Sequence, residues 1–321
     1  MVALIWNGDS KKVIAINGSG KSAASANPEH IRSKGYDSIP MDGPDAALAV
    51  SVPGTVSGWQ KCLDMYGLMT MHEVLQPAIE YAEGGYAVSE IIAHGWAGSE
   101  EKLNHRPSGI EMLPGGKAPK HGDVVQLHTL GKTLRAIAEG GADAFYTGDI
   151  AEKIASYVQS EGGWITEKDL SSHQSDCDEP INTEYHGVTI WECPPNGQGI
   201  AALMALNIAE GFNISEMEEQ SVDRYHYLIE SMRLGYADAL QYVADPRVTN
   251  VPINAMLSKE YAARRRNLIR NDSAMTEVSY GQPATQGDTV YLTVADSHGN
   301  ACSLINSLYA GFGSGLIVPD T

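Results

Sequence analysis

The most informative stretch of this sequence lies near its end and reads Gln286-Gly-Asp-Thr-Val-Tyr-Leu-Thr-Val-Ala-Asp-Ser-His-Gly-Asn-Ala-Cys-Ser-Leu-Ile-Asn-Ser-Leu-Tyr309. Two runs rich in β-branched and aromatic residues, 289–294 and 301–308, are predicted to be strands. Between them lies a short polar turn around His298, whose neighbour Gly299 can adopt a positive φ. The stretch therefore predicts an antiparallel hairpin.

The register of this hairpin would bring two hydroxyl groups together. If the chain folds about His298, the numbers of paired residues add to 596, so Asp296 faces Asn300 and Thr289 faces Ser307. Directly opposed side chains in an antiparallel pair have Cβ atoms about 4.5–5.5 Å apart. Such a Thr–Ser pair has a purely structural interpretation, in which it stabilises the sheet by roughly a few tenths of a kcal/mol.

The same pair also has a chemical interpretation. A threonine hydroxyl is an effective nucleophile when a base lies beside it, and an N-terminal threonine carries its own base, an α-amine with a pKa of about 7.7–8.0. Thr289 is internal, so this route requires cleavage of the Asp288–Thr289 bond. The Thr289 hydroxyl can attack the preceding carbonyl to form an ester that water then opens. The hydroxyl of Ser307 would hold Thr289 in the reactive rotamer.

The rest of the chain is predicted from apolar spacing and turn residues. A first hairpin is expected from the strands Val2–Trp6 and Lys12–Ile16, which flank a polar turn. Helices with one apolar face or a glycine stop are expected at 70–83, 130–139, 150–161, 200–210, 222–243 and 254–269, and a further strand at 188–193. Strands at both ends with helices between them predict an α/β or α+β chain whose sheet joins residues distant in sequence.

Composition excludes several classes of protein. The chain has 321 residues, with 40 acidic and 22 basic side chains and a net charge of −18, so its field repels nucleic acid and anionic lipid. No apolar run reaches the length of a membrane span. The four cysteines lack CxxC spacing and the ten histidines lack HExxH spacing, which argues against a zinc site, a disulfide scaffold or any other metal site.

Two local features have a simple interpretation. The loop Asn17-Gly-Ser-Gly-Lys-Ser22 contains Gly-Lys-Ser, but a phosphate-binding loop would need glycine at position 15, which is Ala15. The basic run Arg264-Arg265-Arg266 is expected to form a solvated helix face.

Both ends indicate a piece of a longer chain, since Met1 leads directly into a strand and residues 313–321 stop on a strand-like run. A natural start and stop is the alternative. No signal peptide is present in this chain, so a periplasmic, secreted or cytoplasmic location stays open.

Several motifs together resemble one family. The segment from Thr289 to Ala301 is similar to the start of the small subunit of the γ-glutamyltransferases. Val50-Ser-Val-Pro-Gly-Thr-Val-Ser-Gly-Trp59 resembles that family's V-P-G-x-V-x-G segment. Further matches follow in the family's order at 75–86, 145–148, 162–170, 194–199 and Asp245-Pro246. The resemblance extends over essentially the whole chain.

The resemblance implies an N-terminal-nucleophile hydrolase with an αββα sandwich, incomplete in this chain, made as a precursor that splits itself. Residues 1–288 would be the large-subunit part and 289–321 the start of the small subunit that partners it. Thr289 would be the nucleophile and Asp288 the new C-terminus. Ser307 matches the family threonine that contacts the nucleophile, and Tyr309 falls where an asparagine contacts the donor.

One departure concerns the donor site. The Arg-Glu pair with which the family binds the donor carboxylate is replaced by Ser19 and Gly20, although Lys21 could supply one positive charge. This variant resembles the branch labelled cephalosporin acylase-like.

The expected function is therefore hydrolysis of a small γ-glutamyl or glutaryl-type amide, or acyl transfer to an amine acceptor, without cofactor or metal. Glutaryl acylase activity is the alternative within enzymes. A non-catalytic fragment or degenerate homologue is the other alternative, because the family's oxyanion amides and the carboxylate that grips the donor's amino group lie beyond Thr321.

Overall fold

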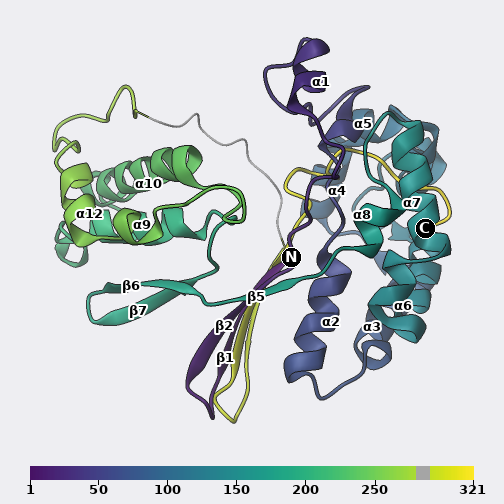
Figure 1. Ribbon diagram of the computed structural model, residues 1–321, viewed down its shortest axis with the longest axis horizontal. Coiled ribbons are helices and arrows are strands. Elements are labelled where there is room, and N and C mark those ends of the chain that lie inside the picture. The colour runs from purple at the N-terminus through teal and green to yellow at the C-terminus, as the bar shows by residue number, and fades with distance from the viewer. Residues whose placement is uncertain (280–289) are drawn as a thin grey trace.

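The computed structural model describes residues 1–279 and 290–321. A narrow sheet runs through the middle of the molecule, with one group of helices on either side of it (Figure 1). Within the described residues no helix is both long and apolar enough to cross a membrane.

The central sheet joins the two ends of the chain. Its five strands lie in the order β5-β2-β1-β9-β8, and all neighbours are antiparallel. Their bounds are β1 Val2–Asn7, β2 Lys12–Asn17, β5 Asp176–Asp178, β8 Val290–Ala295 and β9 Ala301–Asn306. The pairing of β1 with β9 confirms that the sheet joins residues distant in sequence. Two smaller ladders pair β3 (Tyr86–Ala87) with β4 (Val124–Val125) and β6 (Ile181–Tyr185) with β7 (Val188–Glu192).

The larger group of helices precedes β5 in the sequence. It comprises α1 Pro28–Ser33, α2 Thr55–Tyr66, α3 Met71–Gly84, α4 Glu90–Gly98, α5 Glu100–Asn104, α6 His128–Tyr146, α7 Asp149–Ser160 and α8 Glu167–Ser171, with 3₁₀ turns at Ala46–Ala49, Pro107–Met112 and Pro114–Gly116. The α3 helix starts at a capping box between Thr70 and Glu73 and ends before Gly85, whose φ is 89°. Buried side chains of α3, α6 and α7, among them Ile79, Ile137 and Ile154, form the core of this group.

The smaller group follows β7. It comprises α9 Gly199–Ala209, α10 Val222–Tyr242, α11 Ile253–Met256 and α12 Lys259–Arg266, with a 3₁₀ turn at Ile214–Glu216. The α9 helix is buried on nearly all sides. At Gly235 of α10 a Cβ would lie 2.6 Å from the carbonyl oxygen of Ala201, so glycine allows the close approach of these two helices.

Two expectations for the segment 254–269 were wrong. The segment is two short helices, because Ser258 accepts a hydrogen bond from the Tyr261 N–H and starts a new one. The basic run is not a solvated face either. Arg265 is 12% exposed and pairs with the buried Asp238 at 2.9 Å, and Arg266 donates to the carbonyl of Ile208. Arg265 and Arg266 are partly buried because they contact α10 and α9, whereas Arg264 is exposed.

Candidate active site

The predicted C-terminal hairpin is present with the predicted register. The β8 and β9 strands pair from Val290 opposite Asn306 to Ala295 opposite Ala301, so paired numbers add to 596. The turn is closed by a hydrogen bond of 3.0 Å from the Asp296 N–H to the Asn300 carbonyl. Gly299 has a φ of 79°. Asp288 and Thr289, the predicted cleavage site and nucleophile, lie outside the described residues.

The end of the sheet where β8 begins collects several chain segments. Val2 pairs with both Asn17 and Ile305, and Asn17 also pairs with Asp176. Five strand termini therefore lie at the same end of the sheet: the starts of β1, β5 and β8 and the ends of β2 and β9. The N-terminus of α2 joins them, because Thr55 Oγ1 donates a hydrogen bond of 2.8 Å to Asn306 Oδ1.

Ser307 and Tyr309, two of the predicted site residues, come directly after this end of β9. The Ser307 Oγ accepts a hydrogen bond of 3.0 Å from the Tyr309 N–H. Tyr309 has a φ of 74°, a conformation that non-glycine residues adopt rarely. Its side chain is 53% exposed, so the ring is accessible to a ligand.

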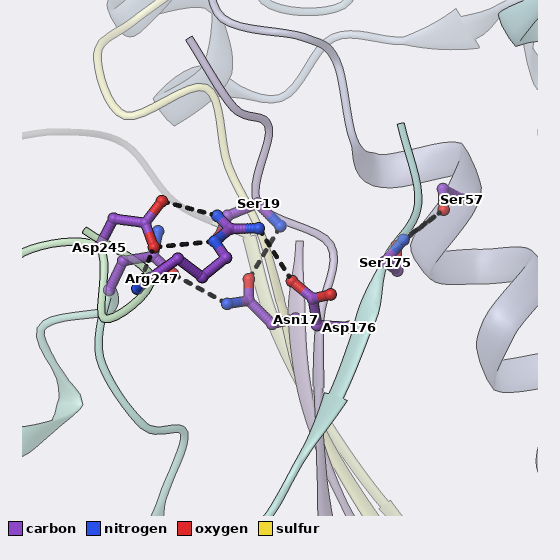
Figure 2. Close-up of polar contacts among 8 residues, drawn as sticks. Asn17, Ser19, Ser57, Ser175, Asp176, Asp245 and Arg247 are labelled. Carbon is purple, nitrogen blue, oxygen red and sulfur yellow. Dashed lines mark hydrogen bonds and ion pairs between the residues drawn. The ribbon is translucent and has the colours of Figure 1, made fainter. Parts of the chain in front are cut away.

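The loop after β2 carries Ser19 and Lys21, which were predicted to lie in the donor site. The Asn17 Oδ1 accepts a hydrogen bond of 3.0 Å from the Ser19 N–H (Figure 2). At Gly20 a Cβ would lie 1.6 Å from the carbonyl oxygen of Val52, so only glycine fits there. The Lys21 carbonyl then accepts a hydrogen bond of 2.9 Å from the Val52 N–H. The loop is thereby held against the segment before α2, with the Lys21 side chain exposed.

The structure adds Arg247, which the sequence reasoning missed. Its Nε and Nη2 each donate a hydrogen bond of 2.8 Å to the Asp245 carboxylate, and its Nη1 lies 3.6 Å from Asp176 Oδ2. Figure 2 shows the guanidinium between these two carboxylates. The hydrogen bonds from Arg247 lower the pKa of Asp245 to about 2, and the charge of Lys21 contributes to the shift. In the sequence, the feature that could have pointed to Arg247 is the adjacent Asp245-Pro246 motif.

A buried histidine lies behind the loop. Neither ring nitrogen of His173 makes a well-formed hydrogen bond within the described residues. Burial lowers the pKa of this imidazole, and the charge of Lys21 lowers it further. The ring centroid lies 5.4 Å from that of Tyr146, whose hydroxyl donates to the Pro53 carbonyl at 2.7 Å. Burial of His173 therefore favours the neutral form of its ring.

A metal has no evident site here. Across 1–279 and 290–321 no group of three or more His, Cys, Asp or Glu side chains is arranged to hold a metal ion. The chemistry available at this end of the sheet is that of hydroxyl groups, a guanidinium and carboxylates.

These features coincide with a known family. The sequence profile described as Gamma-glutamyltranspeptidase matches residues 1–321, and the chain belongs to this family. The Glutathione hydrolase proenzyme of Bacillus subtilis (strain 168) is 32% identical over 337 residues, which cover 99% of this chain and 57% of that protein. The chain therefore spans little more than half the length of this relative.

Solved structures agree with the family assignment. The cephalosporin acylase from Bacillus halodurans matches with a TM-score of 0.89 and 38% identity, over 100% of this chain and 59% of that one. The Helicobacter pylori gamma-glutamyltranspeptidase matches with a TM-score of 0.80 and 28% identity, over 88% of this chain and 82% of that one. The resemblance seen in the motifs and the predicted N-terminal-nucleophile hydrolase fold are thereby confirmed.

Proposed function

We propose that this protein is an amide hydrolase or acyltransferase of the γ-glutamyltransferase type, which cleaves itself before Thr289. The observation that carries the proposal is the register of β8 and β9. Val290 pairs with Asn306, the residue directly before Ser307, so the described part of the hairpin has the register on which the sequence prediction depends. The relatives' names, Glutathione hydrolase proenzyme and cephalosporin acylase, support the same chemistry.

The proposed maturation is an acyl shift. The Thr289 hydroxyl attacks the carbonyl carbon of Asp288, the peptide C–N bond breaks, and an ester to Thr289 Oγ forms as the nitrogen takes up a proton. Water then opens the ester, which leaves a carboxylate on Asp288 and a free α-amine on Thr289. This divides the chain into the parts 1–288 and 289–321 proposed from the sequence.

Turnover uses the freed amine as the base. The Thr289 Oγ attacks the acyl carbon of the substrate amide, the α-amine accepts the hydroxyl proton, and the same proton passes to the leaving amine. An acyl-ester results, and water or an amine acceptor resolves it. Ser307 would orient the Thr289 hydroxyl, and its own Oγ is positioned by the Tyr309 N–H at 3.0 Å.

The acyl group is proposed to be γ-glutamyl or glutaryl. Ser19 offers no charge where a guanidinium would bind a donor carboxylate, which favours a donor site unlike that of the glutathione-acting members. The match to a cephalosporin acylase supports the glutaryl alternative. A non-catalytic homologue is the competing hypothesis, and it predicts neither cleavage nor turnover.

The first test is the intact mass of the purified chain after incubation, beside a Thr289→Ala control. We expect a fragment of 33 residues, from Thr289 to Thr321, only when Thr289 is present. A Ser307→Ala variant should be cleaved more slowly, and Ser307→Thr should restore the rate. An uncleaved wild type, or cleavage that persists in Thr289→Ala, would contradict the assignment of the nucleophile.

Hydrolysis of γ-glutamyl and glutaryl p-nitroanilides then separates the two donor classes. Because the chain spans little more than half of the Bacillus subtilis relative, the assay is run on both the 321-residue chain and any longer product of the same reading frame.

A further inference from the structure

We propose that Arg247 determines the specificity of this site by binding a free carboxylate on the acyl group of the substrate. The location of the scissile amide rests on the proposed function, whereas the carboxylate site rests on the contacts of Arg247 itself.

The guanidinium has unused hydrogen-bonding capacity. An arginine side chain carries five N–H donors in a planar fork. Asp245 accepts from Nε and from one N–H of Nη2, both at 2.8 Å. The 3.6 Å separation of Nη1 from Asp176 is longer than a hydrogen bond. The outer edge formed by Nη1 and Nη2 can therefore accept a second carboxylate in a bidentate arrangement, and the side chain is 48% exposed.

Asp245 is the residue that positions this edge. It also accepts a hydrogen bond of 3.0 Å from the backbone N–H of Arg247, so the carboxylate binds both the backbone and the guanidinium of this residue. Its pKa of about 2 keeps it ionised at neutral pH. An arginine held on one side by an ionised carboxylate presents its free side in a fixed direction, which reduces the entropy lost when a ligand binds.

The free edge lies at the reacting end of the sheet. Asp176, which faces Nη1, pairs across the sheet with Asn17, and Asn17 holds the backbone of Ser19. Arg247, from a segment far along the chain, is therefore linked through Asp176 and Asn17 to the loop that carries Ser19 (Figure 2). The charge of Lys21 also lowers the pKa of Asp245, so a second cation contributes to the electrostatics of this pair.

The neighbouring acids limit which carboxylates bind well. Asp176 is 50% exposed. Burial raises the pKa of the neighbouring Asp178 and the charge of Asp176 raises it further, so this side of the site carries acidic groups. An acyl group with a carboxylate and no amino group would be held by Arg247 alone. One that also carries an ammonium group, as γ-glutamyl does, would gain a contact with Asp176. Both acyl groups, γ-glutamyl and glutaryl, carry the carboxylate that Arg247 would bind. The test below distinguishes between them.

The test compares three p-nitroanilides of similar size: γ-glutamyl, glutaryl and the neutral glutaramoyl, in which the distal carboxylate is an amide. In Arg247→Gln we expect kcat/KM for the two carboxylate substrates to fall about 10- to 100-fold, because charged hydrogen bonds are lost, while the neutral substrate changes little. The matched control is Arg264→Gln, an exposed arginine on α12 that contacts the Tyr261 ring. A fall that is equal for all three substrates, or no fall, would overturn the proposal.

A second variant shows whether the preferred acyl group is γ-glutamyl or glutaryl. In Asp176→Asn a selective loss for the γ-glutamyl substrate identifies a donor with an amino group next to its carboxylate. An unchanged or improved rate for the glutaryl substrate identifies a plain dicarboxylic acyl group.

A binding measurement keeps this inference separate from the proposed function. Calorimetric titration with glutarate, beside the neutral glutaramide, requires no turnover. If no anilide is hydrolysed but glutarate binds the wild type and not Arg247→Gln, the carboxylate site stands and the proposed function fails. If the anilides are hydrolysed with no preference for a carboxylate, the proposed function stands and this inference fails. No glutarate binding together with no carboxylate preference overturns the inference outright.

Discussion

Thr55 and Asn306 are joined by a hydrogen bond of 2.8 Å between the Thr55 Oγ1 and the Asn306 Oδ1. Thr55 is the first residue of α2 and Asn306 the last residue of β9, directly before Ser307. The contact therefore ties a helix N-terminus to the strand that would orient the nucleophile. Since the two residues are 251 positions apart, this bond connects two distant parts of the sequence at the proposed reacting end of the sheet.

Removing this contact should affect both stability and maturation. In Thr55→Val the Asn306 amide oxygen loses its donor, and we expect a loss of about 1 kcal/mol in the free energy of unfolding. We also expect slower self-cleavage, because Ser307 is less firmly held. Thr55→Ser, which keeps the hydroxyl, is the control. Urea unfolding and the rate of fragment appearance by mass spectrometry measure the two effects. Equal behaviour of the Val and Ser variants would contradict this role.

Gly20 should not tolerate any side chain. A Cβ at this position would lie 1.6 Å from the Val52 carbonyl oxygen, so Gly20→Ala must displace the loop that carries Ser19 and Lys21. We expect a loss of about 1–3 kcal/mol in unfolding free energy, together with weaker binding of glutarate. The matched control is Gly98→Ala, where a Cβ meets no atom within 4 Å. A Gly20→Ala protein as stable as the control would show that the loop is not packed as described.

The Asp245–Arg247 pair should stabilise the fold in a pH-dependent way. The pKa of Asp245 is about 2 in the folded protein and 3.8 ordinarily. Because the folded value is the lower one, the stabilisation is fully present above pH 3.8 and is lost as the pH falls from 3.8 towards 2. The effect is small and is weakened by salt, since both side chains are partly exposed.

Thermal unfolding of the wild type and of Asp245→Asn checks this. The Tm of the wild type should exceed that of Asp245→Asn at about pH 6, and this difference should shrink at about pH 2.5. Asp9→Asn, in the exposed turn between β1 and β2, is the control. A difference that is independent of pH would mean that the carboxylate charge does not matter.

His173 should make the protein less stable in mild acid. Burial lowers its pKa below the ordinary 6.5, so the unfolded chain binds the proton more tightly than the folded one. The stability contributed by the neutral ring is complete above pH 6.5 and is lost as the pH falls below that value. His173→Phe keeps a ring beside Tyr146 and removes two polar atoms that lack well-formed hydrogen bonds.

We therefore expect His173→Phe to be as stable as the wild type or more stable at about pH 7.5, and to lose less stability by about pH 5.5. Urea denaturation at the two pH values provides the measurement. His72→Phe, on the exposed face of α3, is the control. If the wild type and His173→Phe lose the same stability on acidification, the buried imidazole is not the group that titrates.

The elements that could be predicted from the sequence are those with local causes. The turn around His298 and Gly299 was sufficient to set the register of β8 and β9, because the length of a hairpin turn fixes which residues are paired. The α3 helix was recognised from its apolar spacing and its glycine stop. One helix boundary was not predicted. The split of 254–269 into α11 and α12 depends on Ser258 acting as an N-cap, which the spacing of apolar residues in this segment does not reveal.

The remaining features of the site required the tertiary structure. Ser19 and Lys21 were found by comparison with the family motif, but Arg247 lies on a loop between α10 and α11 and reaches the site only because β5 returns to the sheet beside β2. Likewise, the sequence predicts a solvated Arg265, whereas the structure pairs it with Asp238 on α10. The physical reason is the range of the interactions. Turn dihedrals and apolar spacing act within a few residues, whereas an ion pair between distant segments exists only after the packing of helices and strands has brought them together.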